Sequence, residues 1–162
     1  MVTAAPACRK ALSDATLRWP KRNRASDGII GDAAHQARKS DHNDGNAFDL
    51  THDPANGVDC EQLAKEVIWD NRVTYVIWNR QICSTDQVHR RQADESCTYP
   101  RYQGPEKHRR WEPYVGTNPH TSHMHVSIRV DARDDLSPWY WSPDEKPPSD
   151  NRMGGPRVSL GA

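Results

Sequence analysis

His123-Met-His-Val-Ser-Ile-Arg-Val130 is a segment whose side chains alternate between polar and apolar at every step. Such a period of two is typical of a β-strand, whose successive side chains point to opposite faces of a sheet. One predicted face is apolar and holds Met124, Val126, Ile128 and Val130. The other is polar and holds His123, His125, Ser127 and Arg129. We therefore expect a sheet with a core on one face and a working surface on the other.

Two further stretches are predicted strands. Residues 73–78 are β-branched and aromatic throughout, and a strand that is apolar on both faces is expected at the centre of a sheet. Residues 47–51 form a shorter predicted strand after a polar loop that contains Gly45. Residues 83–119 are mostly polar and lack a clear period, which predicts a long loop.

The spacing of apolar residues predicts helices over residues 7–19, 33–39 and 59–71. The last is the clearest, with Asp59 at the N-cap and one apolar stripe of Cys60, Leu63, Ala64, Val67 and Ile68. The first is expected to end before Pro20, and Asp32 is expected to cap the second.

Length and composition favour one small domain. The chain has 162 residues and a hydrophobic fraction of 35%, below the roughly 45–50% usual for globular domains. We expect a catalytic domain over residues 1–142, with the Trp139-Tyr-Trp141 stretch docked on it. The proline-rich residues 143–162 are predicted to form a flexible tail or linker stub.

Charge and hydropathy exclude several classes of protein. The 22 basic and 22 acidic side chains cancel, which argues against a general nucleic-acid binder. No run approaches the roughly 18 apolar residues of a membrane span, so no membrane insertion is expected. Neither a charged region nor an apolar one precedes Cys8, and we expect no secretory signal.

The four cysteines contain no Cys-x-x-Cys pair, so a thiolate zinc site is not expected. Cys83 and Cys97 bracket a polar stretch, and the sequence leaves open whether they form a disulfide outside a reducing cytosol.

Two polar clusters contain residues that bind metals. They are Ser40-Asp-His-Asn-Asp-Gly-Asn-Ala-Phe-Asp49 and Asn118-Pro-His-Thr-Ser-His-Met-His125. Zinc in a hydrolase uses about three protein ligands and an open position for water. His42, Asp49 and His125 would supply such a set, with Asp49 and His125 on neighbouring strands and His42 in the loop before the first.

Other residues of these clusters are candidates for catalysis. His123 lies two residues before His125, hence on the same strand face, and can transfer a proton or stabilise an oxyanion. His120 is the next candidate. A substrate carboxylate or oxyanion also needs a cation, for which Arg38 and Arg24 are both available. Taken singly, a His-x-His strand is more often a solvated face, and a loop rich in Asp and Asn more often a turn.

The first cluster resembles a known signature. Ser40-x-His42-x-x-Gly45-x-Ala47-x-Asp49 matches, at every fixed position, the pattern of the D-alanyl-D-alanine metallopeptidases, the VanX/VanY-like zinc peptidases. Those enzymes usually carry a second signature, Glu-x-x-His, and here Ser122 stands in place of the Glu. His120-x-x-His123-x-His125 instead resembles the related murein endopeptidases of the wider group that includes lysostaphin and hedgehog.

The resemblance implies an α+β fold with a small central antiparallel sheet and helices packed against it. It implies Zn²⁺ held by His42, Asp49 and His125, with His123 as base or transition-state stabiliser and His120 assisting. Arg38 and Ser40 are the predicted substrate contacts. The implied reaction is hydrolysis of a stem-peptide amide in bacterial cell-wall peptidoglycan, as an endopeptidase or a D,D-carboxypeptidase.

By analogy with phage endolysins, we expect a monomeric bacteriolytic enzyme that stays in the host cytoplasm until its release to the wall, or that acts outside the cytoplasm. Two alternatives remain at this stage. One is a His-metal nuclease, which the neutral net charge disfavours. The other is a zinc-binding module without catalysis.

Overall fold

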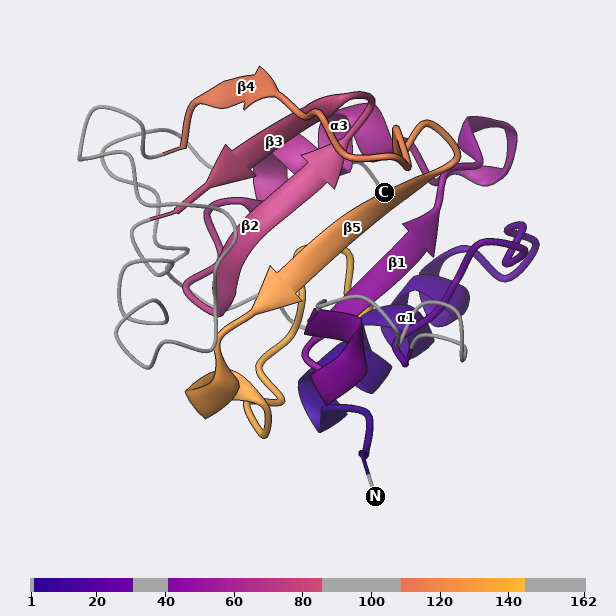
Figure 1. Cartoon of the computed structure of the whole chain (residues 1–162). Coiled ribbons are helices and arrows are strands. Elements are labelled where there is room, and N and C mark those ends of the chain that lie inside the picture. The colour runs from indigo at the N-terminus through magenta and orange to yellow at the C-terminus, as the bar shows by residue number, and fades with distance from the viewer. Residues whose placement is uncertain (1, 31–40, 86–108, 145–162) are drawn as a thin grey trace.

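The computed structural model describes residues 2–30, 41–85 and 109–144, which form a mixed α+β domain around one antiparallel sheet (Figure 1). The sheet has five strands in the order β1-β5-β2-β3-β4. Their bounds are Ala47–Thr51 (β1), Val73–Trp78 (β2), Gln81–Ser84 (β3), Trp111–Pro113 (β4) and His123–Ile128 (β5). The α-helices of the described residues are Pro6–Arg18 (α1) and Cys60–Val67 (α3).

The three predicted strands are confirmed. β2 is the middle strand of the sheet and all six of its residues are buried, as its apolar sequence predicted. β5 ends two residues earlier than the alternation suggested. The N–H of Arg129 donates to the carbonyl of Arg72, and the chain then turns into a short 3-10 helix, Val130–Ala132.

The prediction of one long loop over residues 83–119 was wrong at both ends. β3 already begins at Gln81 and pairs with β2, and β4 pairs with β3. Asn79 and Arg80 form the two-residue turn between β2 and β3, with φ of 49° and 66°. Two successive positive φ angles are typical of a type I′ hairpin turn, whose usual Asn-Gly signature is absent here because Arg80 fills the second position.

The helices predicted over residues 7–19 and 59–71 are confirmed as α1 and α3. α1 ends at Arg18, one residue before its C-cap Trp19. α3 stops at Val67, four residues short of the prediction. Its last turn tightens, since the N–H of Asp70 donates to Val67, and the Asp70 carboxylate then accepts from the N–H of Arg72. The Asp70 side chain thus replaces the helical pattern with a turn.

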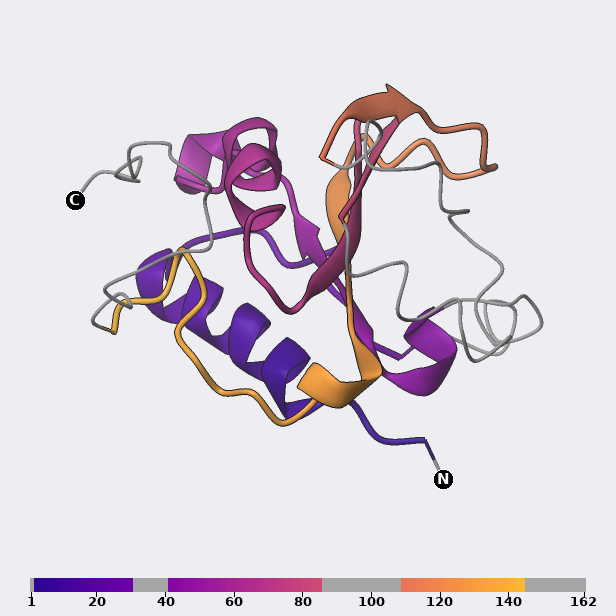
Figure 2. The ribbon, with the colours of Figure 1, turned by 90° about the vertical axis from the view of Figure 1, so that its left-hand side faces the viewer.

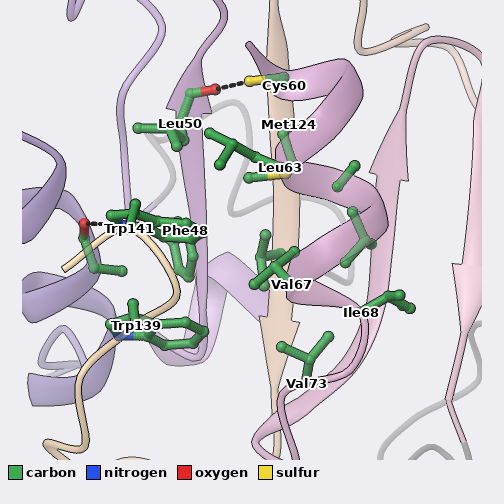
Figure 3. Close-up of a cluster of buried hydrophobic side chains, with 14 of the residues drawn as sticks. Phe48, Leu50, Cys60, Leu63, Val67, Ile68, Val73, Met124, Trp139 and Trp141 are labelled. Carbon is green, nitrogen blue, oxygen red and sulfur yellow. Dashed lines mark hydrogen bonds between the residues drawn. The ribbon is translucent and has the colours of Figure 1, made fainter. Parts of the chain in front are cut away.

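The helices cover one face of the sheet, and the short 3-10 turn η1 (Asp41–Asp44) lies on the other (Figure 2). The core fills the space between the sheet and the helices, where Phe48 and Leu50 of β1 meet Met124 of β5 and Leu63 of α3 (Figure 3). The polar face of β5 is therefore the face turned away from this core.

The predicted docking of the Trp139-Tyr-Trp141 stretch is confirmed. Trp139 and Trp141 are fully buried, and their indole N–H groups donate to the carbonyls of Ala7 and Ala11 on α1. Both rings also meet Phe48 edge-on, at centroid distances of 5.3 and 6.0 Å. Trp139 and Trp141 are thus part of the core.

Several predictions fall outside the described residues: the helix over residues 33–39, most of the tail from Pro143, and Cys97. Cys83 carries a free, buried thiol, as do Cys8 and Cys60. Burial raises the pKa of Cys8 and of Cys83 to about 12, so these thiols stay protonated at neutral pH. Among the described helices, none is long and apolar enough to cross a membrane.

A buried arginine fastens the C-terminal segment to the sheet. The Arg72 guanidinium bonds both carboxylate oxygens of Asp70 and donates to the carbonyls of Asp135 and Ser137. It also stacks over the Trp139 ring, 3.7 Å from the ring centroid. With its side chain 1% exposed, Arg72 depends on these partners to stabilise its charge.

We predict that Arg72→Met lowers the free energy of unfolding by about 3 kcal/mol, because it leaves the largely buried Asp70 carboxylate and two carbonyls without their donor. Urea denaturation followed by tryptophan fluorescence measures this loss. Lys65→Met is the control, since it removes an exposed ion pair to Glu61 and should cost no more than about 0.5 kcal/mol. Equal losses for the two variants would contradict the assigned role of Arg72.

Candidate metal centre

The register between β1 and β5 brings the predicted ligands together. Asp49 lies directly opposite His125, and Thr51 lies opposite His123. Because Phe48 and Leu50 point into the core, Asp49 points to the opposite face, where His125 also lies. Two ligands from sequence positions 76 apart therefore meet through strand pairing alone.

His42 reaches the same point from η1, which leads into β1. Gly45 makes the connection, with a φ of 72° that favours glycine. A Cβ at this position would also collide with the backbone oxygen of Thr3, and the Gly45 carbonyl accepts from the N–H of Ala5. The glycine of the predicted signature thus has a structural reason that is independent of any family.

The three predicted ligands present one atom each to a common point. His42 Nε2 lies 3.2 Å from Asp49 Oδ1, His125 Nδ1 lies 3.3 Å from the same oxygen, and the two nitrogens are 3.1 Å apart. A tetrahedral ion with bonds of about 2.0 Å holds its ligand atoms about 3.3 Å apart. The three side chains therefore form a group that can hold a metal ion.

The outer ring nitrogens are held by acceptors, which fixes the orientation of both imidazoles. His42 Nδ1 donates to the carbonyl oxygen of Ile29 at 2.7 Å, because a carbonyl can only accept. His125 Nε2 lies 2.8 Å from the hydroxyl of Ser127, a fully buried residue. In the metal-free protein the inner nitrogens share protons with Asp49 Oδ1. When each ring instead carries one proton, on its outer nitrogen, the inner nitrogen offers its lone pair to a metal, an arrangement typical of metal-binding histidines.

Charge and burial act against each other in this cluster. Burial alone would raise the pKa of Asp49, but hydrogen bonds from His125 and His42 outweigh it and lower that pKa far below its usual range. Burial would lower the pKa of His42, yet the Asp49 hydrogen bond and charge raise it. In fully buried His125 the effect of burial prevails, and its pKa is lowered. The carboxylate is thus ionised at neutral pH, as a metal ligand requires.

His123 and His120 lie on the other side of Asp49. His123 Nε2 is 3.6 Å from Asp49 Oδ2, and its Nδ1 is 3.1 Å from the Ser122 hydroxyl. The His120 ring lies edge-on to His123 at a centroid distance of 4.9 Å. The structure thus gathers all four predicted histidines around the carboxylate of Asp49.

Hydrogen bonds with Asn79 and Asn118 hold both the backbone and the ring of His120 in place. Its φ is 54°, a left-handed conformation that is uncommon outside glycine. The N–H of Asn79 donates to its carbonyl, and Asn118 accepts both from its N–H, through Oδ1, and from its Nδ1, through the backbone carbonyl. Burial, together with the neighbouring histidines His125 and His123, lowers the pKa of His120 to about 4.

The predicted substrate contacts Arg38 and Ser40 lie outside the described residues. Arg24 is exposed and lines a surface pocket with Arg9 and Leu12 of α1, and no residue around that pocket belongs to the histidine cluster.

The groups that hold the histidine rings in place were not predicted from the sequence. Ser127 stood on the predicted polar face, so its contact with His125 was open to prediction from the alternation. The carbonyl of Ile29 carries no side-chain signal at all. Tyr75 of β2, whose ring stacks on His125 at 5.4 Å, was assigned only to an apolar strand.

No family model, no curated protein and no solved structure matches this chain. The resemblance to the zinc peptidases therefore stays a prediction that rests on the two signatures.

We predict that Ser127→Ala weakens metal binding by about 10- to 100-fold, because His125 loses the partner that orients its ring. Isothermal titration of the metal-free protein with Zn²⁺ measures the affinity. Ser13→Ala, an exposed change of the same kind on α1, should leave it unchanged. An unaltered affinity in Ser127→Ala would show that this hydroxyl does not support the ligand.

The lowered pKa of His120 gives the metal-free protein a pH dependence. The unfolded chain binds a proton at this residue below about pH 6.5, whereas the folded chain does so only near pH 4. The free energy of unfolding should therefore fall as the pH drops from 6.5 to 4, by on the order of 2 kcal/mol for this residue. Urea denaturation across this range should show a smaller fall for His120→Asn, since asparagine tolerates the left-handed backbone. Thr121→Ala, a change at an exposed neighbouring residue, is the control and should show the full fall. An equal fall in the free energy of unfolding for the two variants would contradict the assignment of this pH dependence to His120.

Proposed function

We propose that this chain is a zinc-dependent peptidase that hydrolyses an amide bond in the stem peptide of bacterial peptidoglycan. The observation that carries the proposal is the group of His42 Nε2, Asp49 Oδ1 and His125 Nδ1, which lie 3.1 to 3.3 Å apart beside a further pair of histidines. The resemblance of both clusters to peptidase signatures gives the substrate class.

The donor set suits zinc. Two imidazole nitrogens and one carboxylate oxygen are ligands that Zn²⁺ accepts, and three protein ligands leave a fourth position for water or substrate. The spacing matches the edge of a tetrahedron, and the outer nitrogens already have their partners. When bound, zinc supplies polarisation of the scissile carbonyl and a water of pKa near 7.

The remaining tasks, proton transfer and stabilisation of the oxyanion, fall to the second pair of histidines. His123 Nε2 faces the cluster beside Asp49 Oδ2, so it can take a proton from the attacking water, pass it to the leaving amine or donate to the oxyanion. The Ser122 hydroxyl holds its other nitrogen. His120, packed edge-on against His123, limits the rotation of that ring and adds an acceptor at its Nε2.

The cell-wall stem peptide contains D-residues that ordinary proteases avoid. The candidate bonds are L-Ala–D-Glu, D-Ala–diaminopimelate and the terminal D-Ala–D-Ala. In this proposal the protein acts as a bacteriolytic, endolysin-like monomer on the wall, either after release from a host cytoplasm or outside the cytoplasm.

Digestion of purified diaminopimelate-type peptidoglycan tests the proposal. We predict that the zinc-loaded protein releases fragments with new amino or carboxyl termini, identified by mass spectrometry, and that chelation stops the release. His123→Ala should lower the rate by about 100-fold or more while it keeps one tightly bound zinc, because His42, Asp49 and His125 are untouched.

Two results would contradict the proposal. Release that persists undiminished in His123→Ala would remove this histidine from the reaction. A protein that binds zinc but releases nothing would favour a zinc-binding module without catalysis. Incubation with plasmid DNA and Mg²⁺ or Zn²⁺ checks the nuclease alternative, which predicts nicking.

A further inference from the structure

Asp49 has a second oxygen that the proposed zinc site does not use. While Oδ1 faces His42 and His125, Oδ2 faces Nε2 of His123 at 3.6 Å. Asp49, His120 and His123 form a second group whose ligand atoms all lie within 4.8 Å of one another. One carboxylate therefore stands between two pairs of histidines.

The second pair repeats the support seen in the first. His120 Nδ1 donates to the carbonyl of Asn118 at 2.8 Å, which leaves its Nε2 as the nitrogen available to a ligand. His123 Nδ1 has the Ser122 hydroxyl at 3.1 Å, which leaves its Nε2 turned toward Asp49. In each of these histidines one ring nitrogen has a hydrogen-bond partner and the other is available beside the same carboxylate. This arrangement is typical of metal-binding histidines.

We propose that Asp49, His120 and His123 form a second divalent-metal site, with Asp49 bridging two ions, and that Zn²⁺ bound there inhibits the chain. Carboxylate-bridged pairs of ions stand about 3.5–4 Å apart, a separation that the two oxygens of one carboxylate can span. The inhibitory part rests on the proposed peptidase function, because a zinc ion on His123 Nε2 occupies the nitrogen that the reaction needs.

The second site is the weaker of the two. His123 Nε2 and Asp49 Oδ2 are 3.6 Å apart, against 3.1 to 3.3 Å between the ligand atoms of the first group, so these side chains must move further to close around an ion. A second divalent ion is also repelled by the first, and both share the single negative charge of Asp49. The sites should therefore fill in sequence.

Metal titration of the tag-free, metal-free protein tests the second site without reference to activity. We expect Zn²⁺ to bind in two steps by isothermal titration, with the second step at least 10-fold weaker. Two equivalents of Co²⁺ should give magnetic coupling in the electron paramagnetic resonance spectrum, as a shared carboxylate bridge requires.

Variants assign the second step. His123→Ala and His120→Ala should each lose the weak step and keep the tight one, and the retained step shows that the variant is folded. Thr121→Ala, an exposed residue between the two histidines, should keep both steps. A single step in the parent protein, or two unaltered steps in His123→Ala, would overturn the second site.

Activity then separates this proposal from the peptidase proposal. Peptidoglycan release should be greatest near one equivalent of zinc and fall several-fold when the weak step is filled. If zinc binds in two steps but no peptidoglycan fragments are released, the proposed peptidase function and the proposed inhibition are both wrong, whereas the second metal site is supported. Release that is unaffected when the weak step is filled would overturn the inhibition alone.

Discussion

The pairing register of β1 and β5 is the constraint on which the candidate site depends. It sets Asp49 opposite His125, and the two-residue period of each strand then turns both side chains away from the core. A slip of one residue would bury Asp49 among the aromatic side chains and expose Phe48. The register is held because Phe48, Leu50 and Met124 must face the helices, so the core of the protein determines the geometry of its polar face.

The supports of the cluster come from segments that are distant in sequence but joined by backbone hydrogen bonds. Gly28 bonds to Asp49 on the outer edge of β1, and the neighbouring Ile29 carbonyl holds His42. At the other end, the type I′ turn donates from Asn79 to the carbonyl of His120. These hydrogen bonds restrict the rotation of the His42 and His120 rings before an ion binds. This rigidity is what a site needs to bind a metal at low cost in conformational entropy.

The sequence allowed prediction of three strands, the two described helices and the facing of β5, because each has a strong period and apolar residues that must be buried. It did not reveal β3, which follows a turn without glycine at the expected place, or β4, a strand of only three residues. The residues of the site could be predicted because metal binding and proton transfer depend on the type of side chain. They are His42, Asp49, His120, His123 and His125. The Ile29 and Asn118 carbonyls could not be predicted, since a backbone acceptor carries no residue-type signal and depends on tertiary packing.

We infer that His42, Asp49 and His125 bind a metal ion through Nε2, Oδ1 and Nδ1. A crystal structure of the zinc-loaded protein, with anomalous data collected on both sides of the zinc absorption edge, tests this inference. We expect an anomalous peak bonded to these three atoms at about 2.0–2.2 Å, with the Ile29 and Ser127 contacts intact. A zinc-loaded crystal with no peak at this point, or with zinc held by other residues, would contradict it.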